Sequence, residues 1–196
     1  MALAAPSAAR DPHVNILLTT SPSVSVTARA AMIREISRIW GRAGVRFEWP
    51  APDSDPTGLT LRVMTIERTG PSDEPALLGE LIRGAGTRAV AMIAVDRAIA
   101  IASQGVGHRA SLLYDERLGL VLGRVAAHEV GHFLLASEPH HDSGLMRARF
   151  PESELTEVWS KGFELPSASR DVARSNVLKS GPVRIPSTIA AATAGK

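Results

Sequence analysis

His128-Glu129-Val130-Gly131-His132 is the stretch around which the rest of the sequence can be arranged. If this stretch is helical, its two histidines lie one turn apart on the same face, where both imidazoles can bind one metal ion. The glutamate stands beside them and is free to act as a base. A mid-helix glycine costs about 1 kcal/mol relative to alanine, which predicts that another element packs closely against it. Four of the six histidines lie between residues 128 and 141, and this clustering favours a metal site over coincidence.

A third ligand is needed, because catalytic zinc takes three protein ligands and leaves one position for water. The chain has no cysteine, so its ligands must be histidines or carboxylates. His140 is the predicted third ligand, since the turn over 137–139 can return it to the helix. His141 follows His140 directly in an extended loop, so its side chain would then point away from the helix. The alternatives that remain open are His141 itself and the carboxylates Glu138, Asp142, Glu154 and Glu157.

Hydrophobic periodicity places the motif on a helix that follows a set of strands. The predicted strands are 14–18, 45–49, 59–66 and 89–95, with a continuation over 98–102. The predicted helices are 27–43, 118–135, one within 151–164 and one that begins at Ser167. Residues 68–88 are expected to be irregular, with a short helix over 76–82 as an option. The first strand, helix and second strand lie within about 35 residues, which favours a βαβ unit with parallel strands.

Aromatic residues are scarce, at 4% of the chain, so each one needs a place. The predicted core includes all three tryptophans, Trp40, Trp49 and Trp159. Tyr114, the only tyrosine, is predicted to pack ahead of the motif helix, with a role at an oxyanion as the alternative. The predicted buried side of the last helix consists of Val172, Val177 and Leu178.

Length and composition are those of one globular domain, predicted to cover residues 13–179. Residues 1–12 are expected to be a flexible arm and residues 180–196 a disordered tail. The formal net charge is +2 and the basic residues are scattered, so no nucleic-acid partner is expected. No uninterrupted apolar run approaches the roughly 18 residues of a membrane span, so no membrane partner is expected. The small residues at the start resemble the region around a signal-peptide cleavage site, which favours a secreted or cell-envelope location.

The histidine motif, the third histidine and the segment Ser143-Gly144-Leu145-Met146-Arg147-Ala148 together resemble the metzincin clan of zinc metallopeptidases. The specific match covers residues 124–149 and is similar to a small bacterial branch of zincin-like proteins. The chain departs from the usual metzincin spacing. Metzincins have a glycine three residues after the second histidine and the third histidine three residues further on, where this chain has Leu135 and Glu138. His140 comes two residues later.

The resemblance implies an α+β, zincin-like fold: a twisted mixed sheet of four to five strands packed on an active-site helix, with a backing helix and a C-terminal helix. It implies that Met146 lies beneath the zinc ligands in a tight Met-turn, with a structural role and no bond to the metal. It also implies one catalytic zinc ion on His128, His132 and His140, and a bacterial source.

The predicted function is zinc-dependent hydrolysis of peptide bonds by a monomeric enzyme. Glu129 would act as general base on a zinc-activated water and pass the proton to the leaving amine. A peptide or protein substrate would pair in extended form with an edge strand, expected within 89–102. Two alternatives remain open. One is a zinc-binding protein of zincin-like fold without peptidase activity (a binding module or another amide hydrolase), and the other is a non-metal domain in which the motif is accidental.

Overall fold

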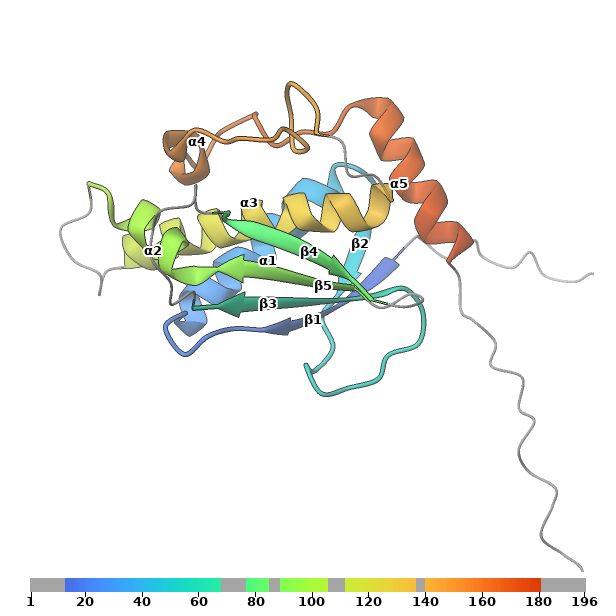
Figure 1. Cartoon of the computed structure of the whole chain (residues 1–196), viewed down its shortest axis with the longest axis horizontal. Helices are drawn as coiled ribbons and strands as arrows, with labels where there is room; N and C mark the ends of the chain where they lie inside the picture. The colour runs from blue at the N-terminus through green and yellow to red at the C-terminus, as the bar shows by residue number, and fades with distance from the viewer. Residues whose placement is uncertain (1–12, 68–76, 85–88, 106–111, 137–139, 181–196) are drawn as a thin grey trace, which may run out of the picture.

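The computed structural model describes residues 13–67, 77–84, 89–105, 112–136 and 140–180. Within these residues the fold is α+β, with a five-stranded mixed sheet and five helices, in agreement with the predicted class (Figure 1). The strands are β1 (His13–Thr19), β2 (Arg46–Glu48), β3 (Thr60–Ile66), β4 (Gly79–Arg83) and β5 (Ala89–Ala94). The helices are α1 (Val26–Gly41), α2 (Val95–Ser103), α3 (Leu112–Leu135), α4 (Glu152–Thr156) and α5 (Ser167–Lys179). The arm expected over 1–12 and the tail from 181 onward lie outside the described residues.

The sheet has the strand order β2-β1-β3-β5-β4. β1, β2, β3 and β5 are parallel, and β4 runs antiparallel to β5 at one edge. β1, α1 and β2 thus form the predicted βαβ unit with parallel strands. β3 shows how the sheet divides its side chains, because Leu61 and Val63 are buried while Arg62 and Met64 between and after them are partly exposed.

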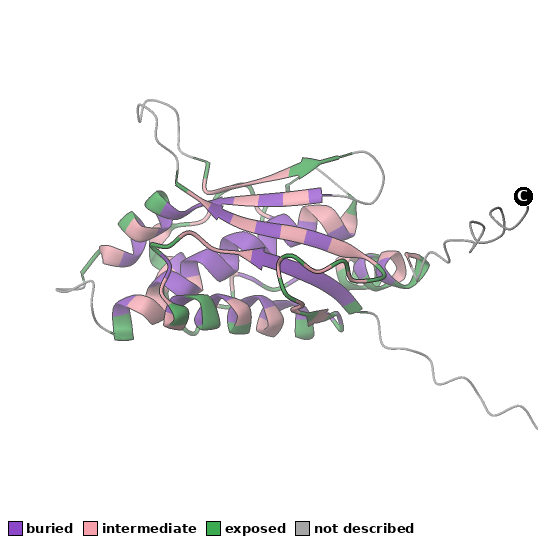
Figure 2. Cartoon of the chain, turned by 90° about the horizontal axis from the view of Figure 1, so that it is seen from below, coloured by how far each residue is buried: buried purple, intermediate pink, exposed green. Residues whose placement is uncertain are grey.

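Helices α1 and α3 lie side by side on the buried face of the sheet (Figures 1 and 2). Ser25 starts α1, because its side-chain oxygen accepts a hydrogen bond from the backbone N–H of Ala28. Gly44 follows the helix with φ at +75°, a conformation that glycine adopts at little cost, and the chain then enters β2. The core between sheet and helices includes Ile16, Val63, Ile93, Met32, Ile36, Leu118 and Leu122.

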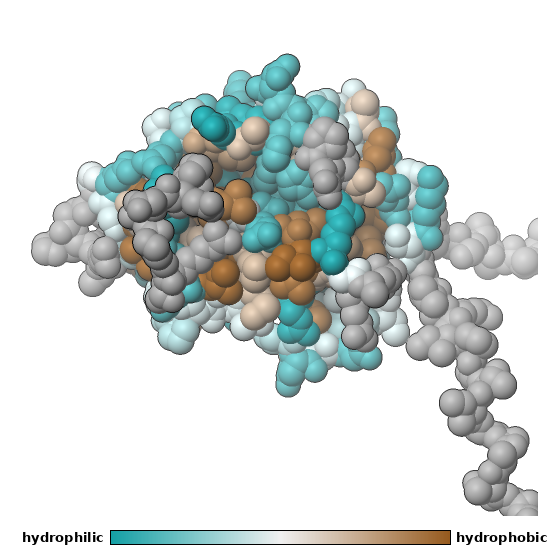
Figure 3. Space-filling model, in the orientation of Figure 1, coloured by the Kyte–Doolittle hydropathy of each residue, from teal (hydrophilic) through white to brown (hydrophobic). Residues whose placement is uncertain are grey.

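The opposite face of the sheet carries partly exposed apolar residues, among them Met64, Val90 and Met92. Figure 3 looks onto this side and shows apolar side chains gathered near its centre, with hydrophilic side chains around them. The core therefore lies on one face of the sheet, the face covered by α1 and α3. The histidine motif is on that side of the sheet.

Among the described helices, α3 is the one whose length and apolar composition would also suit a membrane span. Most of that 18-residue window, 78%, is buried inside the fold. The sequence of α3 contains no long uninterrupted apolar run, because Arg124 and Glu129 stand within it. Here the apolar character of α3 is used by the protein core.

The structure differs from the prediction on both sides of β5. Residues 79–83, expected to be irregular or helical, form β4, because their backbone pairs with β5 in antiparallel register. Residues 98–102, expected to extend the strand, belong to α2, since a short run of small apolar residues fits either periodicity. The buried residues of α2 are Val95, Ala98, Ile101 and Ala102, at helical spacing. β5 is therefore internal, and β4 is the edge strand next to the motif helix.

The segment after α3 contains less helix than predicted. α4 ends at Thr156, so Trp159 does not share a helix face with the buried Leu155. Trp159 is 86% exposed, which makes its predicted place in the core wrong. Trp40 is fully buried as predicted, and Trp49 is partly buried and packs against the core.

The two long C-terminal helices also differ in detail from the prediction. α3 begins at Leu112, earlier than the expected residue 118. In α5, Val177 is buried as predicted, but Val172 and Leu178 are exposed. Ala173 stands four residues before Val177 and shares its buried face, so the apolar stripe is narrower than the sequence pattern indicated.

Candidate metal centre

The histidine motif occupies the C-terminal half of α3, where other elements hold the helix on two sides. Trp40 of α1 donates a hydrogen bond from its indole N–H to the backbone oxygen of Ala127, at 3.1 Å. Arg83 of β4 donates one to the backbone oxygen of His132, at 2.7 Å. The helix that carries His128 and His132 is therefore fixed to the backing helix and to the edge strand of the sheet.

Three histidines converge at this end of α3. One ring nitrogen from each of His128, His132 and His140 lies within 4.8 Å of the others, and the Nε2 atoms of the first two are 3.0 Å apart. Two imidazoles on a tetrahedral zinc, with Zn–N bonds of about 2.0–2.1 Å, would place their nitrogens about 3.3 Å apart. The three histidines can therefore hold a metal ion.

The tautomer of His128 is set by the backbone. Its Nδ1 lies 2.7 Å from the carbonyl oxygen of Leu145, and because a carbonyl can only accept, Nδ1 carries the hydrogen. Nε2 then keeps its lone pair and lies 3.0 Å from the Nε2 of His132. Such a hydrogen bond on the distal nitrogen is the usual support of a metal-binding histidine, because it fixes the ring and makes the ligand nitrogen more basic. The donor set therefore suits a metal ion.

A tight turn over residues 144–147 supplies that carbonyl. Gly144 has φ at +76°, and the backbone N–H of Arg147 donates to the Gly144 oxygen at 3.4 Å. The N–H of His141 donates to the Met146 oxygen at 2.8 Å, which ties the loop behind His140 to the turn. The loop that carries His140 and the carbonyl that holds the His128 ring therefore belong to one local structure.

Met146 explains the glycine in the motif. A Cβ atom at Gly131 would overlap the Met146 sulfur, so a larger residue here would require the methionine side chain to move. Met146 is buried, and its side chain lies against Gly131 of the ligand helix. The predicted close packing against the glycine is present, and the packing element is the 144–147 turn together with Trp40.

Burial favours the neutral, metal-binding form of His128 and His140. It lowers the pKa of His128 to about 4, against the raising effect of the Leu145 carbonyl, and His132 and His140 lower it further. Burial also lowers the pKa of His140, with added repulsion from His132 and His141. Neither group has to lose a proton at neutral pH before it can accept a metal ion.

Glu129 is buried between the ligand pair and the edge strand. A Cβ atom at Gly79 of β4 would lie 2.7 Å from the Glu129 Oε1 and 2.8 Å from the Val125 Cγ1, so a glycine is needed where β4 passes the carboxylate. Burial raises the pKa of Glu129 to about 7, and the negative charge of Glu80 contributes in the same direction. The sequence gives no sign of this contact, because it depends on a strand that was expected to be irregular.

The other proposed ligands do not join the three histidines. His141, Asp142 and Glu157 are not part of the group whose ligand atoms lie within 4.8 Å of one another, and Glu154 pairs with Arg147. Glu138 lies outside the described residues. Among the residues that the structure describes, the one group able to hold a metal ion is His128, His132 and His140.

Tyr114 is far from this group. It is buried in the first turn of α3, and the 14 residues to His128 correspond to about 21 Å of helix. Its position agrees with the packing interpretation and removes the oxyanion alternative.

Phe150 is a neighbour of the site that the sequence did not single out. Its ring lies 5.6 Å from that of His128, centroid to centroid, and is perpendicular to it at 89°.

In comparisons with known proteins, neither a family model nor a curated protein sequence matches the chain.

Proposed function

We propose that the chain is a zinc-dependent metallopeptidase with a metzincin-like, zincin-type fold. One observation carries this proposal: a ring nitrogen from each of His128, His132 and His140 lies within 4.8 Å of the others. The Leu145 carbonyl holds the Nδ1 of His128 on the opposite side of its ring. Three neutral nitrogen ligands are the donor set of a catalytic zinc site, whereas structural zinc sites have four protein ligands. The buried carboxylate beside the pair supports an active rather than a structural site.

His128, His132 and His140 would hold the zinc ion. When bound, zinc supplies a Lewis acid that polarises a substrate carbonyl and lowers the pKa of water. Glu129 is the residue of this chain that accepts a proton at its carboxylate and delivers it to the departing amine nitrogen. Met146 has no chemical part in this scheme and supports the ligand helix from below.

The substrate is proposed to be an extended peptide that lies along β4. β4 lies at the end of the sheet, and among the residues that the structure describes it pairs with β5 alone, so its second edge is proposed to accept a further strand. This replaces the expectation that the edge strand falls within 89–102. Gly79 brings this edge against Glu129, so a peptide paired with β4 passes the base.

Glu129→Gln tests the proposal. We expect the variant to keep one zinc ion per chain, measured by elemental analysis, and to lose at least about 100-fold in the rate of cleavage of an unstructured, fluorescently labelled protein. Glu48→Gln, an exposed carboxylate on β2, is the matched control and should cleave at the wild-type rate. Cleavage retained by Glu129→Gln would refute the mechanism. A wild-type protein that holds zinc and cleaves nothing would favour the alternative of a zinc-binding protein without peptidase activity.

A further inference from the structure

The ring of His128 has two kinds of support. The Leu145 carbonyl holds its Nδ1 edge, and three rings contact it: those of the proposed co-ligands His132 and His140, at 4.6 and 5.3 Å, and that of Phe150, in a perpendicular contact at 5.6 Å. A single hydrogen bond leaves the ring free to tilt about that bond. The perpendicular contact with Phe150 limits such tilting, because a tilted imidazole would lose the edge-to-face geometry that aromatic pairs favour.

Phe150 is itself held in a stack. Its ring lies 5.1 Å from that of Phe163 at an interplanar angle of 18°, and the Arg147 guanidinium carbon is 4.6 Å from its centroid. The Arg124 guanidinium carbon is 4.5 Å from the centroid of Phe163. We call Arg124, Phe163 and Phe150 the aromatic column; it runs from α3 to the metal centre.

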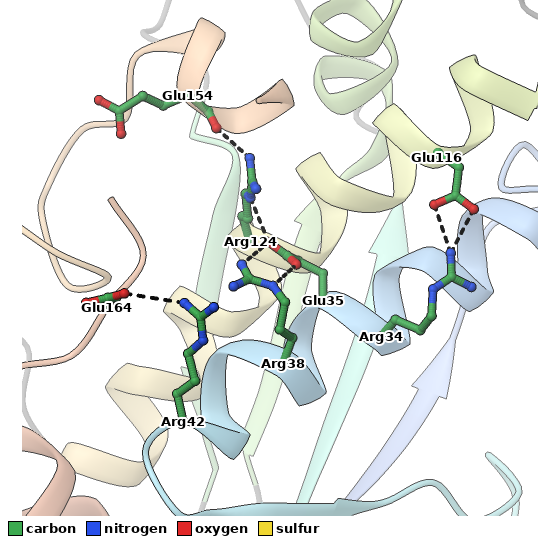
Figure 4. Close-up of polar contacts among 8 residues, drawn as sticks. All are labelled: Arg34, Glu35, Arg38, Arg42, Glu116, Arg124, Glu154 and Glu164. Carbon is green, nitrogen blue, oxygen red and sulfur yellow. Dashed lines mark hydrogen bonds and ion pairs between the residues drawn. The ribbon is translucent and has the colours of Figure 1, made fainter. Parts of the chain in front are cut away.

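The far end of the column is fixed by buried charge. Arg124 is fully buried; its Nε donates to the Glu35 Oε1 at 2.8 Å and its Nη1 to the Glu154 backbone oxygen at 2.5 Å (Figure 4). Glu35 also accepts two hydrogen bonds from Arg38. This network joins α1, α3 and α4, so the guanidinium group cannot move without breaking it.

Two buried N–H donors near the column have no hydrogen-bond partner among the described residues, Arg124 Nη2 and Arg147 Nε. Both belong to guanidinium groups that face phenylalanine rings. A desolvated cation over an aromatic ring is attracted to the ring face, which offsets part of the cost of a missing hydrogen-bond partner. The unpaired donors therefore indicate that stacking on the rings governs this region.

We propose that Phe150 is a positioning residue for the metal ligand His128, held in place by the aromatic column. The inference rests on the proposed metal-binding function and does not depend on peptide cleavage. If the Phe150 side chain only filled space, any apolar side chain of similar volume could replace it. A positioning residue needs the flat ring, and its loss changes how the histidine meets the metal.

The test is metal binding by Phe150→Tyr, Phe150→Leu and Phe150→Ala. Zinc affinity is measured by competition with a chelator, and the visible spectrum of the cobalt-loaded protein reports the ligand geometry. We expect Phe150→Ala to weaken zinc binding by about 10- to 100-fold, the usual effect of removing a support of a metal ligand. Phe150→Leu should give a smaller loss with altered cobalt bands, and Phe150→Tyr should keep the wild-type affinity and spectrum. Trp159→Ala, an exposed aromatic residue in the same segment, is the control and should change neither.

Folding is checked by circular dichroism, and Phe150→Leu carries the test if Phe150→Ala does not fold. Wild-type affinity and an unchanged cobalt spectrum in folded Phe150→Leu would overturn the inference and leave the proposed function standing. A wild-type protein that binds neither zinc nor cobalt would overturn both.

Discussion

Gly131→Ala is a direct probe of the contact between the motif helix and the 144–147 turn. The new Cβ atom would overlap the Met146 sulfur, lie 3.0 Å from its Cε and lie 3.6 Å from the Trp40 ring. Helix propensity alone favours alanine by about 1 kcal/mol. Overpacking of a core costs about 1–3 kcal/mol, and the upper end applies because Met146 is enclosed. We expect a net loss of about 2 kcal/mol in the free energy of unfolding.

The same substitution should have the opposite sign once the methionine is shortened. Met146→Ala alone is expected to cost about 2–5 kcal/mol, as for other buried methionines. It also removes the sulfur that Gly131→Ala would meet, so in this background only the helix-propensity gain of about 1 kcal/mol remains. The two substitutions should therefore deviate from additivity by about 3 kcal/mol.

Urea unfolding of the metal-free wild type, the two single variants and the double variant measures this deviation. Gly41→Ala is the matched control, because a Cβ atom there has nothing within 4 Å and should be neutral or stabilising by less than about 1 kcal/mol. Additivity within about 0.5 kcal/mol, as for residues that do not touch, would refute the close contact on which the account of the turn depends.

Two further predictions concern buried charge. Arg124→Met breaks a buried pair and leaves Glu35 with one partner fewer, so it should lower the free energy of unfolding by about 3–5 kcal/mol. Arg34→Ala removes an exposed pair with Glu116 and should lower it by less than about 1 kcal/mol. Equal losses of the two variants on urea unfolding would contradict this. In the metal-free protein, burial raises the pKa of Glu129 from 4.5 to about 7, so a stability penalty develops as the pH rises from 4.5 to 7 and reaches roughly 3 kcal/mol. Metal-free Glu129→Gln should therefore be more stable than wild type above pH 7 and match it below pH 4.5, and a variant that is less stable above pH 7 would contradict the burial of the carboxylate.

The local part of the site can be predicted from sequence. His128 and His132 lie on one face because four residues make about one helical turn, and no tertiary information is needed for that. His140 follows only as one candidate among several, since its position depends on how the loop meets the 144–147 turn. The family resemblance implied a Met-turn beneath the zinc ligands but did not name the element that packs on Gly131; the structure shows that Met146 makes that contact.

The parts that depend on a distant partner could not be predicted. β4 exists because it pairs with β5, and its own sequence, with Gly79 at the start, has little strand character. Phe150 gives no local signal, because its neighbours Phe163 and His128 come from other segments. One signal was available and was missed: Arg124 interrupts an apolar helix face, and a charge in that place must find a buried partner, here Glu35.

The central claim is that His128, His132 and His140 bind one zinc ion and that His141 does not. Elemental analysis of the purified wild type, His140→Ala and His141→Ala, after dialysis against a weak chelator, tests it most directly. We expect one zinc ion per chain in the wild type and in His141→Ala, and almost none in His140→Ala. A metal-free wild type would contradict the claim, and so would zinc that is retained by His140→Ala but lost from His141→Ala.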